Sequence, residues 1–436
     1  MKIVSQQVQL NRRLKRGGES DAHWALFFLF PFFSALYAIW SYRSKWAKNV
    51  LWAFVVFYGT TFSTSVETSN KELGASDIHR YAEEVQELYK QPMTVKLALS
   101  YFNETGEVDI LRTVIAIIVS RFTDKMNVLT TVYALIFGFF MTRNLWYLFE
   151  RLNRKVSWVT IMLLLVFFLS NPFWYINGFR FNTAMHIYLF GLLPFLYEGK
   201  KKGILIAAST VLVHFSFVFP VMILLLYLIA GQRLAIYFYF FIISFFFASI
   251  NVKQFNNFLE NNFPNAFVER SKTYRDEEKV NEFREREEDF MPGAKKKSWH
   301  AVWYQKGLYW VLKASFVLLY ILYRDNIKSD KKLLRLFCFT LLFWGFANIT
   351  SSMPSGGRFL LLVSLFALAF LVLFTQRFSN HKYLKDLLVL FTPLFLLFIF
   401  VTIRIGFYSI SLNTFFGNPF LTFFTDYNIS LNDIIK

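Results

Sequence analysis

Hydrophobic residues along the chain gather into eleven runs that are separated by short polar segments. Most runs approach the ~20 apolar residues that an α-helix needs to cross ~30 Å of hydrocarbon. The pattern predicts an all-α polytopic membrane protein with about 10–12 transmembrane helices and no separate soluble domain. The runs are 24–41, 49–63, 126–147, 157–173, 183–197, 203–230, 234–250, 303–323, 332–349, 357–375 and 386–403.

The polar segments divide the chain into three parts. A basic N-terminal tail covers 1–23, a transmembrane domain covers 24–404, and a C-terminal tail covers 405–436. Within the transmembrane domain, the longer segments 64–125 and 251–302 are expected to be outer loops. No cleavable signal peptide is evident, so the first apolar run must direct the chain to the membrane.

The charge distribution gives the chain a direction across the membrane. With 55% hydrophobic residues, a net charge of +18 indicates topology rather than nucleic-acid binding. Basic residues concentrate in short loops, and such loops face the cytoplasm. The lone Cys338 lies inside an apolar run and leaves no disulfide framework. The five basic segments are 43–48, 150–155, 198–203, 323–332 and 376–385.

This assignment of sides requires one apolar run to turn back. If 198–203 and 323–332 lie on the same side, an even number of crossings must separate them, yet three apolar runs lie between. The 203–230 run has 28 residues and is interrupted by "HFSFVFP" (214–220). We therefore predict a broken or re-entrant segment near residue 214 that lines a protein cavity.

The start of the chain presents a similar conflict. The basic tail and the basic 43–48 segment flank a single run and cannot both face the cytoplasm. Either the tail lies along the interface, or the first run is itself a hairpin.

Three parts of the outer loops have a residue pattern that predicts their structure. Apolar residues recur with helical spacing after residue 77, which predicts a surface helix that ends before Pro92. The 110–120 piece is too short to span and is expected to lie in the outer interface or to re-enter. The 251–300 segment carries ten acidic and ten basic residues, which is typical of a solvated charged helix or of a lid over an external site. The residues with helical spacing are Ile78, Tyr81, Ala82, Val85, Leu88 and Tyr89.

Charged groups in and near the runs indicate the chemistry. No Asp or Glu lies in the middle of any run, although ion-coupled transporters usually keep carboxylates there. The sequence contains no phosphate loop and no zinc-binding spacing. What remains is cationic: Arg180 and Arg358 each open a run, and Lys313 lies on one helical face with Lys306. His214 lies at the predicted break.

Such cations suit an anion held at the membrane surface. The planar fork of arginine binds phosphate oxygens and keeps its charge. Gly356 and Gly357 leave backbone N–H groups open to a phosphate at a helix start. A lipid-linked pyrophosphate fits, because its charge needs cations and its chain needs access from the bilayer. The alternative is that these side chains merely reach toward lipid headgroups.

Four short motifs, in order, carry a family resemblance. From about residue 50 to 375 the chain resembles the EpsG-like branch of the Wzy-type polysaccharide polymerases, which make O-antigen, capsule and exopolysaccharide. It departs from the usual pattern in its long basic tail and in "GASD" before Ile78. The motifs are "SDIHRY" (76–81), "NGFRFNTA" (177–184), "HFSF" (214–217) and "SGGRF" (355–359). The matching residues are Asp77 and Tyr81, Arg180 and Ala184, His214 and Ser216, and Arg358 and Phe359.

The resemblance implies a membrane glycosyltransferase of the GT-C type in the bacterial cytoplasmic membrane. Such a polymerase transfers a growing glycan from undecaprenyl pyrophosphate to the non-reducing end of a lipid-linked repeat unit on the outer face. It needs no cofactor and no metal. Its expected partners are undecaprenyl-pyrophosphate-linked oligosaccharide repeats and membrane lipids, with a chain-length regulator as a further candidate and no nucleic acid.

Residue roles follow from this chemistry, with alternatives left open. Asp77 and His214 are the candidate catalytic bases, although Asp77 could cap a helix and His214 could simply bond a neighbouring helix. The candidate substrate-binding residues are Arg180, Arg358, Tyr81, Asn177, Ser216 and Lys313. Weaker candidates are His79, Arg80 and His186. An O-antigen ligase or a non-enzymatic flippase or carrier of lipid-linked glycans would use similar cations.

Overall fold

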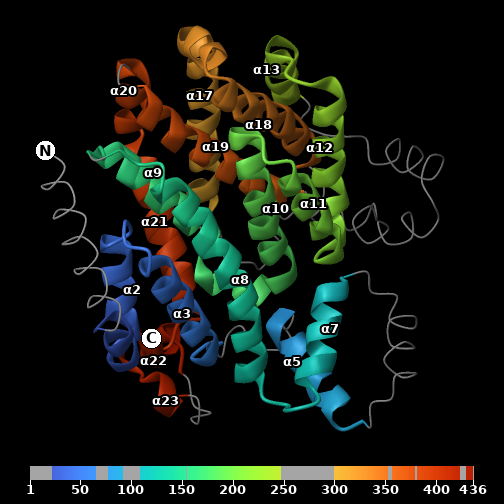
Figure 1. Ribbon diagram of the computed structural model, residues 1–436, viewed down its shortest axis with the longest axis vertical. Helices are drawn as coiled ribbons and strands as arrows, with labels where there is room; N and C mark the ends of the chain where they lie inside the picture. The colour runs from blue at the N-terminus through green and yellow to red at the C-terminus, as the bar shows by residue number, and fades with distance from the viewer. Residues whose placement is uncertain are drawn as a thin grey trace, which may run out of the picture.

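A computed structural model describes most of the chain as a helical bundle (Figure 1). The described residues contain no β-strand. Five helical segments in them are long and apolar enough to cross a membrane, and the bent pair α20–α21 makes a sixth. The chain is therefore an all-α, multi-pass membrane protein, as predicted. The described residues are 22–64, 77–91, 109–153, 155–246, 299–351, 356–378, 381–422 and 429–435.

The bundle is built from helices of unequal length. The N-terminal half contains α2 (Pro31–Trp40), α3 (Ala47–Thr60), α8 (Met126–Phe149), α9 (Trp158–Ser170) and α10 (Phe179–Glu198). The C-terminal half contains α13 (Leu234–Ile243), η5 (Ser244–Phe246), α17 (Trp299–Ser329), α18 (Lys331–Thr350), α19 (Gly357–Arg377), α20 (Lys382–Leu390) and α21 (Thr392–Gly406). Between the halves lie α11 (Lys202–Ala208), η3 (Ser209–Leu212), η4 (Phe215–Phe217) and α12 (Val218–Ala230).

Polar contacts join the basic segments at one end of the bundle. They connect segments that are far apart in the sequence, so the five basic segments lie together as their charge predicted. We call this the basic end; it includes the upper part of α20 in Figure 1. The contacts join Arg43 to the Asn153 carbonyl (2.7 Å), Asn153 to the Gln376 carbonyl (2.7 Å), Arg377 to Asp330 (3.0 Å) and Arg151 to Glu198.

The segment from α11 to α12 is a re-entrant hairpin. Its first arm follows Gly199, which lies against the guanidinium of Arg335 near the start of α18. Its second arm returns to the same place, because the Tyr227 hydroxyl donates to the Arg335 carbonyl over 3.1 Å. Because both arms meet Arg335, the segment enters and leaves the bundle at the same end and makes no net crossing of the membrane. The predicted turn near His214 is confirmed.

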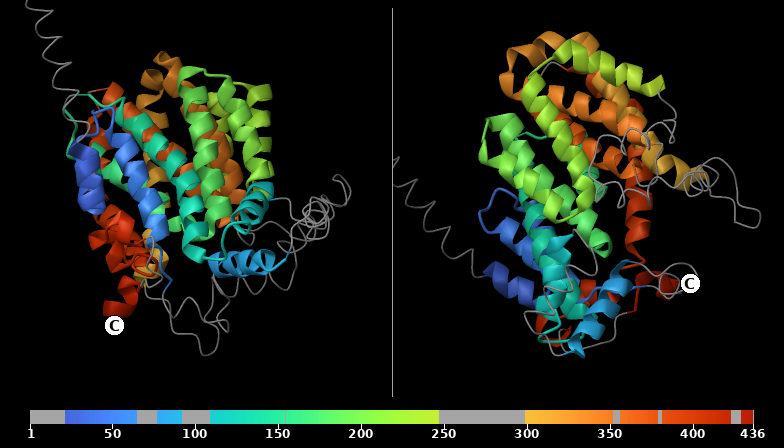
Figure 2. Two further views of the ribbon diagram at one scale, coloured as in Figure 1. Left: turned by 60° about the horizontal axis from the view of Figure 1, so that its bottom comes forward. Right: turned by 90° about the vertical axis from the view of Figure 1, so that its right-hand side faces the viewer.

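Close packing holds the first arm of the hairpin against α10. A Cβ atom on Gly191 would lie only 2.9 Å from the backbone nitrogen of Ala207, and one on Gly203 would clash with the Gly191 carbonyl. Small residues allow such close backbone approach between helices in membranes. The hairpin therefore packs into the bundle beside α10 (Figure 2).

The first apolar run also turns back. Residues 22–29 are helical and fold against α2, so that the His23 ring stacks on Trp46 with 3.5 Å between centroids and lies 5.3 Å from the Tyr37 ring. Both ends of this run therefore lie near the 43–48 segment. Of the two alternatives for this region, the structure has the hairpin.

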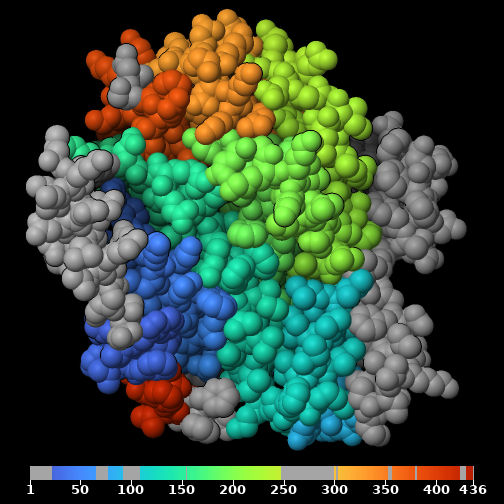
Figure 3. Space-filling model, viewed as in Figure 1, coloured from blue at the N-terminus to red at the C-terminus, as the bar shows by residue number. Residues whose placement is uncertain are grey.

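The other end of the bundle, which we call the distal end, carries short helices. Here α5 (Asp77–Tyr89) packs on α7 (Ile110–Val119), and η2 (Phe173–Gly178) leads into α10. Figure 3 shows α7 on the surface beside the start of α8. The helix predicted after residue 77 is confirmed, although Tyr89 is exposed. Neither the 1–21 part of the tail nor most of the 251–300 segment, for which a charged helix or a lid was predicted, lies within the described residues.

The C-terminal residues close the distal end. They include α22 (Leu412–Phe416), α23 (Pro419–Thr422) and α24 (Leu431–Ile435). The Ser411 hydroxyl donates to the Thr61 carbonyl over 2.8 Å, just after α3. The tail therefore packs beside the start of the first outer segment.

Cysteine labelling tests this topology. In a Cys338→Ser background, we expect a membrane-impermeant maleimide to label Phe416→Cys in intact cells. Phe416 is exposed at the distal end, which faces outward if the basic end faces the cytoplasm. Both Lys201→Cys and Gln232→Cys, which are exposed and flank the hairpin, should react only after permeabilisation. Labelling of just one of these two from outside would mean that the 202–230 segment crosses the membrane.

Candidate functional site

A buried carboxylate joins three segments at the distal end. Asp109 precedes α7, and its Oδ2 accepts from Arg180 Nη1 of α10 over 2.8 Å. Its Oδ1 accepts from the backbone N–H of Phe215, at the tip of the hairpin, also over 2.8 Å. Asp109 makes no side-chain bond to its own helix start. Its two oxygens instead fix the outer loop, α10 and the hairpin tip to one another.

His214 lies at the hairpin tip in a defined orientation. Its Nδ1 accepts from the backbone N–H of Ser216 over 3.1 Å and lies 2.8 Å from the Ser216 hydroxyl oxygen. Because a backbone amide can only donate, Nδ1 must carry the lone pair, so the proton of the neutral ring resides on Nε2. His214 therefore presents a donor at Nε2, whereas a base at that position would need a free lone pair.

Arg358 lies in the first turn of α19, facing the same region. Its guanidinium carbon is 5.5 Å from the centroid of the Phe181 ring, and that ring is 5.4 Å from His214 in an edge-on arrangement. A Cβ on Gly357 would meet no described atom within 4 Å. Arg358 is exposed.

The helix α5 lies beside Arg180, on the outer side of the region around the hairpin tip. Tyr81 is buried with its ring between two guanidinium groups, whose carbons lie 4.9 Å (Arg112) and 5.4 Å (Arg180) from its centroid. Burial raises the pKa of Tyr81 to about 12, although Arg180 favours the ionised form. Tyr81 thus remains a neutral phenol at physiological pH. One turn before it, Asp77 is partly exposed and pairs with Arg80.

The charges of these segments converge on His214. Asp77, Asp109, Arg180 and Arg358 all interact electrostatically with the imidazole. Three of the arginines in the region are each paired with a carboxylate. Among the described residues, Arg358 has no such partner. The three pairs are Arg80 with Asp77, Arg112 with Glu84, and Arg180 with Asp109.

The structure brings most of the predicted site residues together and separates two of them. Lys313 lies in an apolar groove on α17, with aromatic neighbours of its own. Asn177 lies in η2 and lines a different hollow at the distal end. The residues that gather around the hairpin tip are Asp77, Tyr81, Arg180, His214, Ser216 and Arg358.

The hollow at Asn177 has the composition of a sugar site. It has a volume of about 450 Å³ and is lined by Trp174, Tyr175, Asn182 and Tyr408, among others. Within the described residues, the buried Trp174 Nε1 and Asn177 Oδ1 have no hydrogen-bond partner. Aromatic rings and amide side chains lining one hollow would suit a polar ligand with flat apolar faces.

The sequence analysis did not identify the residues that hold Arg180 and Tyr81 in place. Asp109, Arg112 and Glu84 were not candidates, yet they hold Arg180 and Tyr81 in place. The available signal was the position of Asp109, directly before the 110–120 apolar piece. The weaker candidate His186 is buried at the core side of α10, where its Nε2 is 3.0 Å from the Asn171 carbonyl oxygen. This contact is structural.

The Asp109 contacts predict a large effect on stability. Asp109→Ala should lower the free energy of unfolding by ~3 kcal/mol, because it strands Arg180 and the Phe215 amide in a mostly buried site. Asp77→Ala, which breaks a more exposed pair, should cost only about 0–1 kcal/mol. Thermal unfolding in detergent can be followed by reaction of a thiol dye with Cys338, which is buried in the folded state. Equal melting temperatures for the two variants would contradict this account.

Comparison with known proteins agrees with the sequence motifs. The model of the EpsG family matches residues 72–416, which is most of the chain and includes every residue around the hairpin tip. No curated protein and no solved structure matches the chain. The matched region runs from the segment before α5 to the end of α22. The chain therefore belongs to the EpsG family, whose members are membrane proteins of the polysaccharide polymerase type.

Proposed function

We propose that the protein is a polysaccharide polymerase that transfers a growing glycan from undecaprenyl pyrophosphate to the non-reducing end of a lipid-linked repeat unit. Family membership supports the reaction class. The observation that carries the assignment to a site is the position of Arg358. It is a cation without a described carboxylate partner, it lies against the same Phe181 ring that His214 meets edge-on, and it is in the first turn of a helix.

In this proposal the donor pyrophosphate binds between α19 and the hairpin tip. Arg358 offers a planar fork to phosphate oxygens, and the first turn of α19 offers backbone N–H groups. His214 donates its Nε2 hydrogen to the same anion. Arg180 already bonds Asp109, so it adds positive potential and holds the hairpin tip. These groups stabilise negative charge on the leaving group without requiring a divalent ion.

The glycan would lie in the hollow beside η2. Its aromatic walls can stack on sugar rings, and the polar side chains that line it, such as Asn177 and Ser409, can bond hydroxyl groups. The hollow and Arg180 are adjacent along the chain, because η2 runs directly into α10. A substrate with its pyrophosphate at Arg358 and its sugars toward η2 would therefore follow the distal surface.

The chemical step joins the two substrates by a single glycosidic bond. The acceptor hydroxyl oxygen attacks the anomeric carbon of the donor, and the bond from that carbon to the pyrophosphate oxygen breaks. Asp77 accepts the hydroxyl proton; it is the candidate base, since its carboxylate is partly exposed and Nε2 of His214 is already protonated. Undecaprenyl pyrophosphate leaves with the bonding electrons, and the product remains attached to the acceptor lipid.

The orientation of the bundle fits this reaction. Clustered basic loops face the cytoplasm in bacterial inner-membrane proteins, so the distal end would lie on the outer face. There the enzyme, a metal-independent glycosyltransferase of the GT-C type, would meet lipid-linked repeats. A chain-length regulator would act on the same face.

Substitution of the two arginines tests the pyrophosphate site. Arg358→Ala should slow polymerisation by about a hundredfold, because it removes a contact to the leaving group worth ~3 kcal/mol. Arg358→Lys should recover little of this, since an ammonium lacks the fork. Arg180→Ala should slow polymerisation and also lower the melting temperature. The measurements are binding of a synthetic polyprenyl-pyrophosphate-linked repeat and the ladder of products from it.

The control for charge removal is Arg233→Ala, at an exposed position at the basic end. Wild-type binding and a wild-type ladder for Arg358→Ala would reduce that residue to a headgroup contact. Binding by the wild-type protein without any new glycosidic bond would favour a flippase. Transfer without lengthening would favour a ligase.

The two candidate proton-transfer residues should behave differently. Asp77→Asn should abolish the ladder while leaving donor binding unchanged, because a base acts on the acceptor proton. His214→Ala should weaken donor binding, whereas His214→Gln should retain part of it, since an amide can still donate. Isothermal binding and ladder assays on the same preparations separate the effects. Normal donor binding by His214→Ala would instead assign the base to His214.

A further inference from the structure

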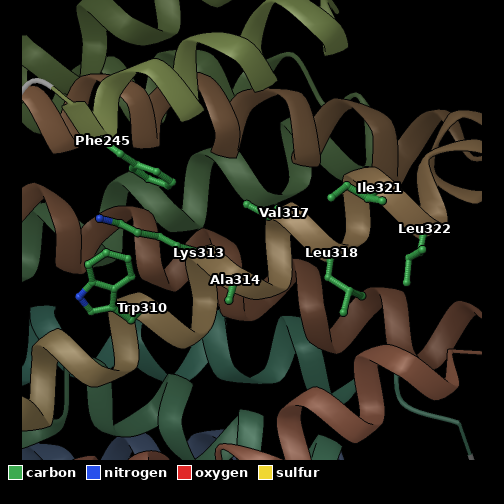
Figure 4. Close-up of a pocket in the computed structure, with 8 residues that line it drawn as sticks. All are labelled: Phe245, Trp310, Lys313, Ala314, Val317, Leu318, Ile321 and Leu322. Atoms are coloured by element: carbon green, nitrogen blue, oxygen red, sulfur yellow. The ribbon is translucent and has the colours of Figure 1, made fainter.

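An apolar groove runs along the exposed side of α17, beside η5 (Figure 4). Its volume is about 460 Å³, and its walls include Phe245, Trp310, Leu318 and Leu322. The stretch from Trp310 to Leu322 covers ~18 Å of helix. Trp310 and Leu322 are exposed on the surface of the bundle. A groove of this length and composition can hold a hydrocarbon chain.

One cation interrupts the apolar surface. Lys313 extends between two aromatic rings, with its Nζ 5.2 Å from the centroid of Phe245 and 5.7 Å from that of Trp310 (Figure 4). No carboxylate in the described part of the chain forms an ion pair with it. An ammonium in an apolar membrane environment is costly unless an anion or water meets it. The groove therefore suits a ligand with a hydrocarbon chain and a negatively charged group.

Lys313 lies near the middle of α17, at the Trp310 end of the groove. Its neighbour Phe245 follows Ser244, whose Oγ accepts from Asn348 Nδ2 over 2.8 Å. Asn348 is in the last turn of α18, which begins at the basic end. The cation thus lies away from the basic end, and its aromatic neighbours differ from those at the hairpin tip. Lys313 and Arg358 are therefore two separate cationic positions.

We propose that this groove binds the polyprenyl chain of the acceptor lipid and that Lys313 binds its pyrophosphate. The proposal rests on the polymerase function argued above, which requires two lipid carriers at once. The acceptor reacts through its far, non-reducing end. Its own pyrophosphate must therefore lie about one repeat unit away from the donor pyrophosphate at Arg358, which explains why a second cation lies apart from the first.

Separate substrates allow the two lipid sites to be tested independently. The donor is a polyprenyl-pyrophosphate-linked repeat whose acceptor hydroxyl is replaced by hydrogen, so that it can only donate. The acceptor carries a methylene group in place of the oxygen that joins its sugar to the pyrophosphate, so that it can only accept. With the purified full-length protein, Lys313→Met should raise the KM for the acceptor about tenfold and leave the KM for the donor unchanged. Lys313→Arg should remain near wild type. Lys328→Met, at the exposed basic end of the same helix, is the matched control.

A second variant tests the groove without removing the charge. Ala314→Phe fills the groove beside Lys313 and should also raise the KM for the acceptor. If the wild-type protein forms no glycosidic bond, the polymerase proposal fails. If it does, and both Lys313→Met and Ala314→Phe keep the wild-type KM for the acceptor, the lipid site is wrong while the polymerase stands. Weaker binding of Lys313→Met to phosphatidylglycerol vesicles, with an unchanged KM, would likewise overturn the site in favour of a phospholipid contact.

Discussion

The candidate site depends on the two hydrogen bonds that Asp109 accepts. One comes from Arg180 and the other from the Phe215 amide, so a single carboxylate fixes α10 and the hairpin tip to the outer loop. A re-entrant turn leaves backbone N–H groups without helical partners at its tip, and such groups cannot remain open inside a membrane protein. Asp109 satisfies one of them. Burial deprives the Asp109 carboxylate of its hydration, and this hydrogen bond offsets part of that cost.

The pairing of charges then determines which cation is available. Carboxylates accompany Arg80, Arg112 and Arg180, whose positive charges are thereby balanced. Arg358 has none among the described residues and rests on the Phe181 ring, a contact that favours a cation without neutralising it. An incoming anion would therefore meet its strongest unopposed charge at the start of α19. Of the four arginines in this region, the proposed anion site therefore depends mainly on Arg358.

The sequence predicted the features that depend on local pattern or on counting. Helical spacing located α5, clustered charge located the basic end, and the need for an even number of crossings located the hairpin at His214. The first run could not be assigned, because the tail and the 43–48 segment carry the same sign of charge. The partner of Arg180 was missed because Asp109 is 71 residues away, and no local pattern records such a pairing. Lys313 and Asn177 were predicted from their residue types, but tertiary packing places them away from the hairpin tip.

The two proposed lipid-carrier sites follow from the physics of an amphipathic substrate. Sugars need hydrogen-bonding partners and aromatic faces, which the hollow beside η2 could provide, whereas a polyprenyl chain must remain in hydrocarbon. The groove on α17 is apolar except for Lys313, at a separate place on the surface. A protein that holds two lipid carriers needs its second charge at a distance from Arg358, because two pyrophosphates bound side by side would repel each other.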